Sequence, residues 1–404
     1  MSSSPSERKA FAEKQLELAK IDQSKLVSDI QTLELADSSS SHGELRLVKL
    51  GAHLLKELQN GKRLVFRGRR EDAPVLCSDT HTYSVKEAET SNSMLLVPDL
   101  TVENDPGIVG TERAVQFRQV AGMTSKFYEL KPVEKFKTGR LKELLEESPY
   151  CGPEGNCSSS MEVDSEPPEK KLLTLSAILD EVQGSEAEMK QAIDKLPVCV
   201  IDGFYRWLDF DLRAKILSEV IDLCDTADSG VSTDSVDLRA VRQSVTDDVC
   251  PLSVLEKTMS GFASANEDGS WRLEERPVCR FLAQMLLRTA RKFDFDDFVD
   301  SWAKLLPAGM DTHLDYIKGL GIVDDAPSGR KTVSYLPSEE LPEEAVPRLR
   351  LLFEQRHKWR HDDLVVYLEE LVHSPKEVGA ILAKYCRSSL VNGVRYYNRK
   401  ESVL

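Results

Sequence analysis

The sequence predicts an α+β protein in which a β-rich amino-terminal part is followed by helical modules that each end in a β-hairpin. Short runs of β-forming residues, separated by turn signals, fill the first 150 residues. After residue 171 the apolar residues recur at helical spacing, and one order of elements occurs three times. With 404 residues, of which 41% are hydrophobic and 30% charged, the chain can bury about two to four ordinary cores.

The sequence predicts neither a membrane segment nor a secretory signal. No apolar run approaches about 20 residues, and Met1–Arg8 lacks an apolar core. The cysteines lie far apart with no Cys-x-x-Cys pair, so we expect reduced thiols in an intracellular protein. They are Cys77, Cys151, Cys157, Cys199, Cys224, Cys250, Cys279 and Cys386.

The charge is distributed unevenly along the chain. The formal net charge of −15 argues against broad coating of nucleic acid. Residues 348–404, however, contain 11 Lys and Arg against 7 Asp and Glu, a net charge of +4, so residues 1–347 carry −19. The sequence therefore predicts a small basic domain at the end of an acidic chain.

Two stretches rich in Ser, Pro, Gly and acidic residues are interpreted as linkers, because such residues cannot build a core. They span residues 151–171 and 226–236. The remaining segments are predicted to be a β-rich domain at 1–150 and three modules at 172–225, 236–337 and 338–404.

The β-rich domain is predicted to hold seven strands that form an antiparallel sheet or a partial barrel. The expected strands are residues 45–50, 63–67, 74–78, 82–86, 94–97, 114–120 and 127–130. Helices are expected at about 9–35 and 134–147, and Asn60-Gly61 is expected to form a turn. A barrel this small leaves open strand edges that a partner could cover.

The first module shows the repeated pattern most clearly. Its apolar stripes predict two amphipathic helices, and Ser185 with Glu188 forms a capping box at the start of the second. A hairpin over 198–208, turning at Asp202-Gly203, and a helix over 212–223 follow. The two stripes are Leu175, Ile178, Leu179 and Val182, then Met189, Ala192, Ile193 and Leu196.

The second and third modules repeat this order. Helices at about 252–262 and 278–293 introduce the second module, and a hairpin over 322–336 ends it. Its stripes are Phe295, Phe298, Val299 and Trp302, then Met310, Leu314 and Ile317. In the third module, Ser374-Pro375 marks a helix start and Asn392-Gly393 a hairpin turn. Its stripes are Leu364, Leu368 and Leu371, then Val378, Ile381, Leu382 and Tyr385.

Helix, turn, helix and hairpin in this order is the plan of a winged-helix domain, in which the apolar stripes bury a three-helix core and the hairpin lies alongside. A helical bundle with loops is the alternative for any single copy. Three copies favour winged helices.

No catalytic, metal or cofactor site is predicted. Residues 328–332 (SGRKT) match a phosphate-binding loop only in part, because the upstream Gly is missing and a strand follows, so we interpret them as a hairpin turn. The seven histidines lack metal-ligand spacing, and His357 with His361 is interpreted as part of a basic surface. No nucleophile adjoins a predicted base. We therefore expect a protein that is not an enzyme and binds no cofactor.

The charge of the second helix and of the wing indicates which module binds DNA, because these parts of a winged helix meet the duplex. The second helices of the first two modules carry more acids than lysines, which favours protein binding. The third module combines basic and aromatic residues that suit phosphate contact and base stacking. Its predicted DNA-binding residues are Lys376, Lys384, Arg387, Arg395, Tyr396, Tyr397, Arg399 and Lys400. The alternative is a basic surface in a protein-binding module.

Six segments, in the same order along the chain, resemble the Dcc subunit family of the cohesion-specific clamp loader. They are GKRLVFRG (61–68), AETSNSMLLV (88–97), LLEESPYCGP (144–153), GFYRWLDF (203–210), PAGMDTHLDYIKGLGIVD within 293–324, and GAILAKYCRSSLVNGVRYYN (379–398). The resemblance covers nearly the whole chain.

The resemblance implies a nuclear, non-enzymatic subunit of an alternative replication factor C that supports sister chromatid cohesion. The β-rich part would share a composite barrel with a large ATPase subunit and a small companion subunit. The winged helices would bind the catalytic subunit of DNA polymerase epsilon and single- and double-stranded DNA, in an assembly that loads and unloads the PCNA clamp at replication forks. From the residues alone, a sequence-specific winged-helix transcription regulator is the alternative.

Overall fold

The chain forms two compact units that both contain helices and strands, which confirms the α+β class. One unit holds residues 1–63 with 83–132, and the other holds 64–82 with 133–404. No described helix is long and apolar enough to cross a membrane. The computed structural model describes residues 5–21, 30–35, 46–98, 100, 115–152, 172–226, 230–244, 250–325, 329–372 and 374–400.

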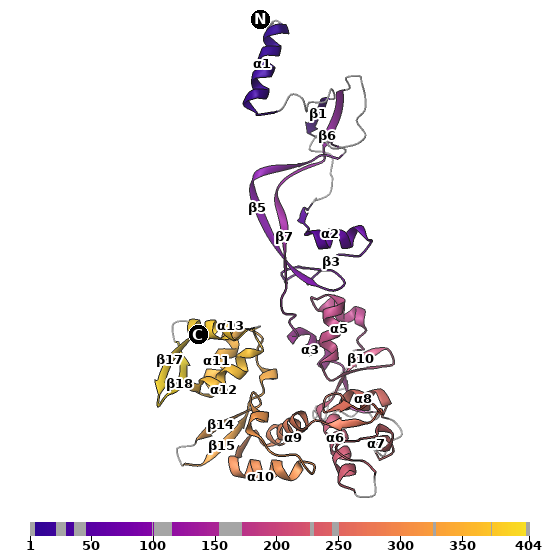
Figure 1. The fold of residues 1–404 in the computed structure, drawn as a ribbon, viewed down its shortest axis with the longest axis vertical. Helices are drawn as coiled ribbons and strands as arrows, with labels where there is room; N and C mark the ends of the chain where they lie inside the picture. Colours follow the sequence, from indigo (N-terminus) through magenta and orange to yellow (C-terminus); the bar gives the residue numbers. More distant parts are fainter. Residues whose placement is uncertain are drawn as a thin grey trace, which may run out of the picture. The chain divides into compact units, whose positions relative to one another are not determined.

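The first unit is built from long paired strands and two helices (Figure 1). Strands β5 and β7 pair antiparallel, whereas β2 joins β7, and β1 joins β6, in parallel. The pairing is therefore mixed, not wholly antiparallel as predicted. The elements are α1 Pro5–Leu18, β1 Ile30–Leu35, β2 Val48–Lys49, α2 Ala52–Gln59, β5 Thr82–Leu96, β6 Val115–Val120 and β7 Gly122–Pro132.

Two sequence predictions for this unit are wrong in detail. The helix expected over about 9–35 ends at Leu18, and residues 30–35 form β1 instead. The alternating sequence IQTLEL pairs with β6 along its whole length, so cross-strand pairing outweighs the helical propensity of Leu and Glu. The strands expected at 82–86 and 94–97 are one strand, β5, with a register shift between Glu89 and Met94.

The second unit begins with a short hairpin that is anchored to the helices following it. Its strands are β3 Val65–Arg67 and β4 Val75–Cys77. Arg67 Nη1 donates to the carbonyl oxygen of Leu179 at 2.5 Å, and Gln183 Nε2 donates to that of Ala73 at 2.8 Å. The first bond satisfies a carbonyl group in the last turn of the helix Leu175–Glu181, and the second joins Gln183, just beyond that helix, to the loop of the hairpin.

The rest of the second unit repeats one order of elements four times: helix, strand, helix, helix and a two-stranded hairpin. In each copy the last strand lies between the first strand and the other hairpin strand. The copies are repeat 1 (139–208), repeat 2 (210–273), repeat 3 (275–335) and repeat 4 (345–399). The segment 236–337, predicted as one module, therefore contains most of repeat 2 and all of repeat 3.

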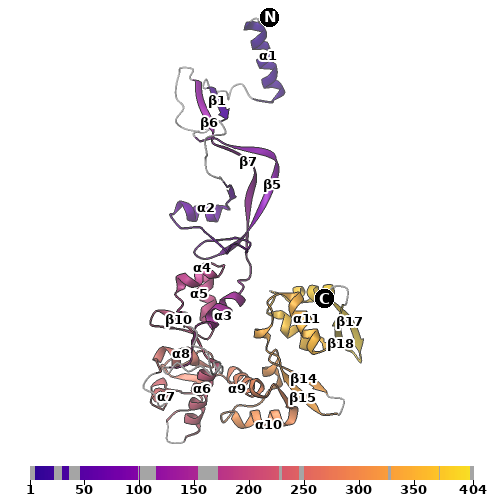
Figure 2. The same ribbon diagram turned by 180° about the vertical axis from the view of Figure 1, so that it is seen from behind.

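Repeat 1 includes a helix that lies before the predicted linker. Leu141, Leu144 and Leu145 of α3 are fully buried against Ile178 and Met189, so α3, α4 and α5 share one core (Figure 2). The capping box of Ser185 and Glu188 is confirmed. The elements are α3 Gly139–Glu146, β8 Pro149–Tyr150, α4 Leu175–Glu181, α5 Glu186–Asp194, β9 Val198–Ile201 and β10 Phe204–Leu208.

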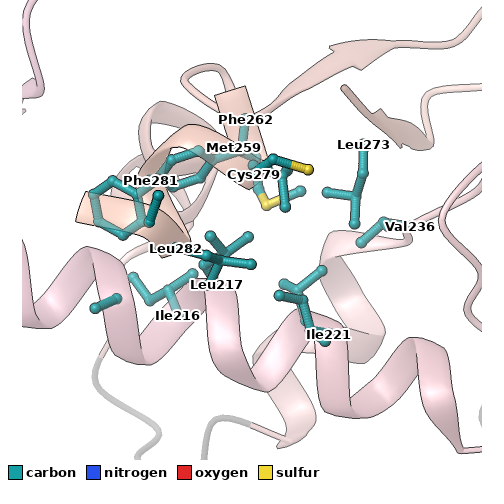
Figure 3. Packing of buried hydrophobic residues seen from close by; sticks show 14 of the residues in the cluster. Ile216, Leu217, Ile221, Val236, Met259, Phe262, Leu273, Cys279, Phe281 and Leu282 are labelled. Atoms are coloured by element: carbon teal, nitrogen blue, oxygen red, sulfur yellow. The ribbon is translucent and has the colours of Figure 1, made fainter. Parts of the chain in front are cut away.

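Repeat 2 takes its first helix from the segment predicted to end the first module. Ile216, Leu217 and Ile221 of α6 pack against the core that also holds Met259 and Leu282 (Figure 3). Its first strand is reduced to Val236, which bridges Trp271. The other elements are α6 Phe210–Asp225, α7 Leu238–Ser244, α8 Leu252–Met259, β11 Ala263–Ala265 and β12 Trp271–Leu273.

Repeat 3 departs from the prediction at its third helix. The helix expected from Met310 to Ile317 is a 3-10 helix of four residues, η2. His313, directly before it, has an extended backbone with φ −124° and ψ 125°, so helical geometry begins only at Leu314. The elements are α9 Glu275–Ala290, β13 Lys292–Asp294, α10 Phe295–Leu305, η2 Leu314–Ile317, β14 Gly321–Asp325 and β15 Lys331–Tyr335.

Repeat 4 follows a single 3-10 turn, η3 Ser338–Glu340. Its third helix begins at Pro375, as predicted, and its hairpin turns at Asn392 and Gly393, whose φ angles of 50° and 79° suit a tight two-residue turn. The elements are α11 Ala345–Gln355, β16 Lys358–Arg360, α12 His361–Glu369, α13 Pro375–Tyr385, β17 Cys386–Val391 and β18 Val394–Arg399.

Two repeats use the outer face of their sheet, the face turned away from their own helices, to contact the next repeat. Cys199 and Leu208 on the outer face of repeat 1 belong to the core that contains repeat 2. Ile322 on the outer face of repeat 3 belongs to the core of repeat 4. These outer faces are therefore covered.

Candidate nucleic-acid interface

The basic end of the chain is held on a well-packed scaffold in repeat 4. Trp359 of β16 and Tyr367 of α12 are almost fully buried, with ring centroids 5.5 Å apart. The indole Nε1 of Trp359 donates to the carbonyl oxygen of Leu352 at 3.0 Å, which satisfies the buried donor. Val378 and Leu382 of α13 complete this core. The exposed sides of α13 and of the sheet are therefore presented rigidly.

Two predicted residues, Lys376 and Lys384, are exposed on α13, the helix that Figure 1 labels near the carboxyl terminus. They are eight residues apart, slightly more than two helical turns, so they lie on the same side of the helix. The ammonium of Lys384 is 4.9 Å from the ring centroid of Tyr385. This side of α13 can approach a phosphate backbone without moving the core.

The hairpin residues divide between the two faces of the sheet, because side chains alternate along a strand. Tyr396 lies opposite Ser389, and Arg387 opposite Asn398, which places all four on the outer face. Arg395 lies opposite Leu390, and Arg399 opposite Cys386, on the face that carries Tyr397. The predicted set is therefore not one continuous patch.

Tyr397 is a core residue, so its prediction as a DNA-binding residue is corrected. Its side chain is only 7% exposed, and it lies opposite Trp359 in the sheet. A ring enclosed in this way cannot stack on a base. The pair Tyr396-Tyr397 did not reveal which tyrosine faces inward, since alternation fixes only that the two point in opposite directions.

Two basic residues on the outer face escaped the sequence analysis. Lys358 and Arg360 flank the buried Trp359 in β16, and both are exposed. They lie opposite Asn398 and Tyr396 and so join Arg387 on the same face. Basic residues at alternate positions of the sequence KWR indicate a strand with one basic face, but a strand of three residues is too short to be recognised from alternation alone.

Arg395, Arg399 and Lys400 lie toward the ends of the sheet. Arg395 and Arg399 are exposed, and Lys400 is partly buried, with its backbone N–H donating to the carbonyl oxygen of Tyr385 at 3.3 Å. Lys400 follows directly on β18 and lies beside the end of α13. These residues extend the basic surface without joining the outer face.

The helices at the corresponding place in repeats 1 and 3 present a different surface. In α5, Lys190 forms an ion pair with Glu186 at 2.6 Å, which lowers the pKa of Glu186 and raises that of Lys190. Lys318, directly after η2, pairs with Asp315 of η2 at 2.5 Å. Each of these lysines thus has an acidic partner close by in the sequence, which disfavours phosphate contact.

The free cysteines of the described part of the chain are buried or partly buried. No group of three or more His, Cys, Asp or Glu in that part could hold a metal ion. Burial raises the pKa of Cys279 to about 12 and those of Cys224 and Cys386 to about 11, so these thiols are poor nucleophiles.

The expectation of eight reduced thiols is wrong for Cys151. This residue is disulfide-bonded, whereas the six other described cysteines are free. Sequence spacing alone did not separate this cysteine from the others, because disulfide formation depends on how closely two side chains approach.

The fold and the candidate site together define a modular α+β protein whose last repeat carries exposed basic residues on a packed scaffold. The chain belongs to the Dcc1 family of sister chromatid cohesion proteins, because the family model "Sister chromatid cohesion protein Dcc1" matches residues 45–368. Proteins with this name are similar along almost their full length. The protein from Danio rerio is 32% identical over 392 residues, with 96% of this chain and 97% of the relative covered.

Two further relatives have the same name. The Homo sapiens protein of the same name is 31% identical over 393 residues, covering 96% of this chain and 97% of the relative. The Saccharomyces cerevisiae protein is 22% identical over 370 residues, covering 85% and 93%. The family model ends within α12, so α13 and the final hairpin lie beyond the matched segment.

Proposed function

We propose that this chain is a non-enzymatic subunit of an alternative, cohesion-specific clamp loader in the nucleus. It joins a large ATPase subunit and a small companion subunit, and the assembly loads and unloads PCNA at replication forks. The chain connects this loader to the catalytic subunit of DNA polymerase epsilon and to single- and double-stranded DNA. Membership of a sister chromatid cohesion family carries the proposal.

The four repeats are proposed to be winged-helix domains, which revises the predicted three. The support is their shared element order and shared strand order, with the last strand in the centre of each small sheet. In a winged helix, the third helix, which is the second helix of the helix-turn-helix, and the hairpin lie on accessible surfaces. Each of the four repeats is thus proposed to be one winged-helix domain, and the first unit is proposed to bind the partner subunits.

The composite barrel with two partner subunits is supported by exposed apolar side chains in the first unit. Leu35, Phe117 and Met123 are 75%, 67% and 66% exposed. Among the described residues, strands β1 and β6 form a sheet of two strands, and an isolated two-stranded sheet is marginally stable in water. Further strands from a partner would cover these side chains and complete the pairing.

DNA contact is proposed for repeat 4, and protein contact for repeats 1 and 3. The support is the contrast between exposed Lys376 and Lys384 on α13 and the internally paired Lys190 on α5. Contacts to phosphates are independent of sequence and weaken steeply with salt. An adaptor needs this kind of binding, because it must hold DNA at any position.

Co-expression with the two clamp-loader partners tests the proposal. We expect a stable three-subunit complex. As a matched variant, Leu35→Asp with Phe117→Asp should weaken assembly without unfolding the repeats. A full-length chain that folds alone and never joins either partner would overturn the proposal.

The alternative function, a winged-helix transcription regulator, is distinguished by a binding titration. The adaptor should bind mixed DNA sequences equally and with a steep salt dependence. A regulator should prefer one site by about 4 kcal/mol or more over other sequences.

A further inference from the structure

The outer face of repeat 4 is exposed, whereas the outer faces of repeats 1 and 3 are covered. It is formed by alternate residues of β16, β18 and β17. These residues are Lys358, Arg360, Val394, Tyr396, Asn398, Arg387, Ser389 and Val391. Lys358, Arg360 and Arg387 are all exposed to solvent.

The composition of this face differs from that of the covered faces. The covered faces place Cys199, Leu208 and Ile322 in apolar cores. The outer face of repeat 4 has three basic side chains and no acidic one. Burying three unpaired cations against another repeat would cost far more than apolar contact returns, so the occupant of this face must supply negative charge.

Within the described part of the chain, no carboxylate forms an ion pair with Lys358, Arg360 or Arg387. The acids nearest in sequence to Arg360 lie in the first turn of α12, where Asp363 is paired with Arg356 at 3.2 Å. The positive charge of the outer face is therefore available to an external anion.

Tyr396 gives the face an aromatic surface among the cations. The ammonium of Lys358 lies 4.6 Å from the centroid of its ring, and the ring is only partly buried. A nucleobase that stacked on this ring would displace the ammonium, which could then contact the adjoining phosphate. Cations interleaved with an aromatic ring are the arrangement by which proteins hold single strands without reading sequence.

We infer that the outer face of repeat 4 is a binding surface for single-stranded DNA, separate from the exposed side of α13. This inference rests on the proposed function, because it concerns the DNA that the adaptor holds. Lys358, Arg360 and Arg387 contact phosphates, and Tyr396 stacks on a base. The bases of a duplex are paired and cannot stack on the Tyr396 ring. Loss of this ring therefore weakens the binding of single strands alone.

The test is fluorescence anisotropy of the full-length chain with a labelled oligothymidylate and with a labelled duplex. The double variant Lys358→Ala, Arg360→Ala should bind the single strand about tenfold more weakly, with a salt slope smaller by about 1.4. The control Lys304→Ala, Arg350→Ala removes the same charge from exposed positions on α10 and α11 and should bind normally. Tyr396→Ala should bind the single strand about fivefold or more weakly and bind the duplex as wild type does, and Tyr396→Phe should restore the affinity for the single strand.

Two results separate failure of the inference from failure of the proposed function. If Lys358→Ala, Arg360→Ala binds like wild type while Lys376→Ala, Lys384→Ala loses affinity, the outer face is not the site and DNA binding through α13 stands. If neither variant loses affinity, both the inference and the proposed DNA contact of repeat 4 are overturned. Equal loss of single strand and duplex in Tyr396→Ala would also overturn the single-strand assignment.

Discussion

Arg356 of repeat 4 forms an ion pair with Asp324 of repeat 3, its Nε donating to Asp324 Oδ1 at 2.6 Å. The same guanidinium donates to the carbonyl oxygen of Val323 at 2.6 Å and to Asp363 at 3.2 Å, and lies over the ring of Trp359. A single side chain thus joins the outer face of one repeat to the helices of the next. The planar guanidinium suits this multiple contact, which a lysine could not reproduce.

Replacing Arg356 should destabilise the junction between repeats 3 and 4. We expect Arg356→Ala to lower the free energy of unfolding by about 2 kcal/mol, because charge-assisted hydrogen bonds in a mostly buried position are lost. Urea unfolding of Arg356→Ala, Asp324→Ala and the double variant gives the coupling energy. Strict additivity of the two single changes would contradict a direct interaction, and the exposed Lys9→Ala serves as control.

Replacing Arg348 should have a larger effect. This arginine is only 3% exposed and donates to the carbonyl oxygens of Ser338, Leu341, Pro342 and Tyr367, and to the Glu370 carboxylate. Arg348→Ala leaves these buried acceptors without a donor, so we expect a loss of about 3 kcal/mol in chemical denaturation. Arg348→Lys should recover only part of it. Full recovery by lysine would show that the fixed geometry of the guanidinium is unimportant.

Removing the capping box should destabilise repeat 1 modestly. Ser185 accepts a hydrogen bond from the Glu188 N–H, and the Glu188 carboxylate accepts from the Ser185 N–H and from the Thr82 hydroxyl. Ser185→Ala should cost about 1 kcal/mol in thermal unfolding, and Ser185→Thr, which keeps the hydroxyl that donates to Glu188 at 2.6 Å, should restore most of it. Identical stability of the alanine variant and wild type would show that the capping box does not stabilise repeat 1.

The stability of the chain should fall at high pH through its buried thiols. Burial raises the pKa of Cys279 to about 12 from the ordinary 9.0, so the fold favours the neutral thiol. This contribution is fully present below pH about 9 and is lost as pH rises toward 12. Iodoacetamide at pH 8 should leave Cys279 unlabelled in the native chain and label it in urea. Rapid labelling of the native chain would contradict its burial.

Local chemistry allowed the sequence to predict the turns and caps. Asp202-Gly203 and Asn392-Gly393 form the expected hairpin turns with positive φ at every position, and the helix start at Ser374-Pro375 is also confirmed. Each of these features is determined by residues next to one another in the chain. The apolar stripes likewise identified buried residues such as Ile178 and Leu382.

Features that depend on distant partners were missed. Strand β1 is stabilised by β6, which begins 80 residues after β1 ends, and Val236 becomes a strand position only through Trp271. The fourth repeat was hidden because its first strand is reduced to Val236, at the end of a stretch interpreted as a linker, and because α7 directly after it was not predicted. For the candidate site, the sequence predicted which segment is basic. Which face each side chain occupies depends on β16, whose buried Trp359 fixes the register.

The most direct test of the account is the salt dependence of DNA binding by a charge-reversed repeat 4. The changes are Lys384→Glu, Arg387→Glu, Arg395→Glu, Arg399→Glu and Lys400→Glu, made together in the full-length chain assembled with the proposed clamp-loader partners. The slope of log affinity against log salt on mixed-sequence DNA should become shallower by several units, with weaker binding to every sequence and intact assembly. Unchanged affinity and slope would contradict the assignment of repeat 4 to DNA.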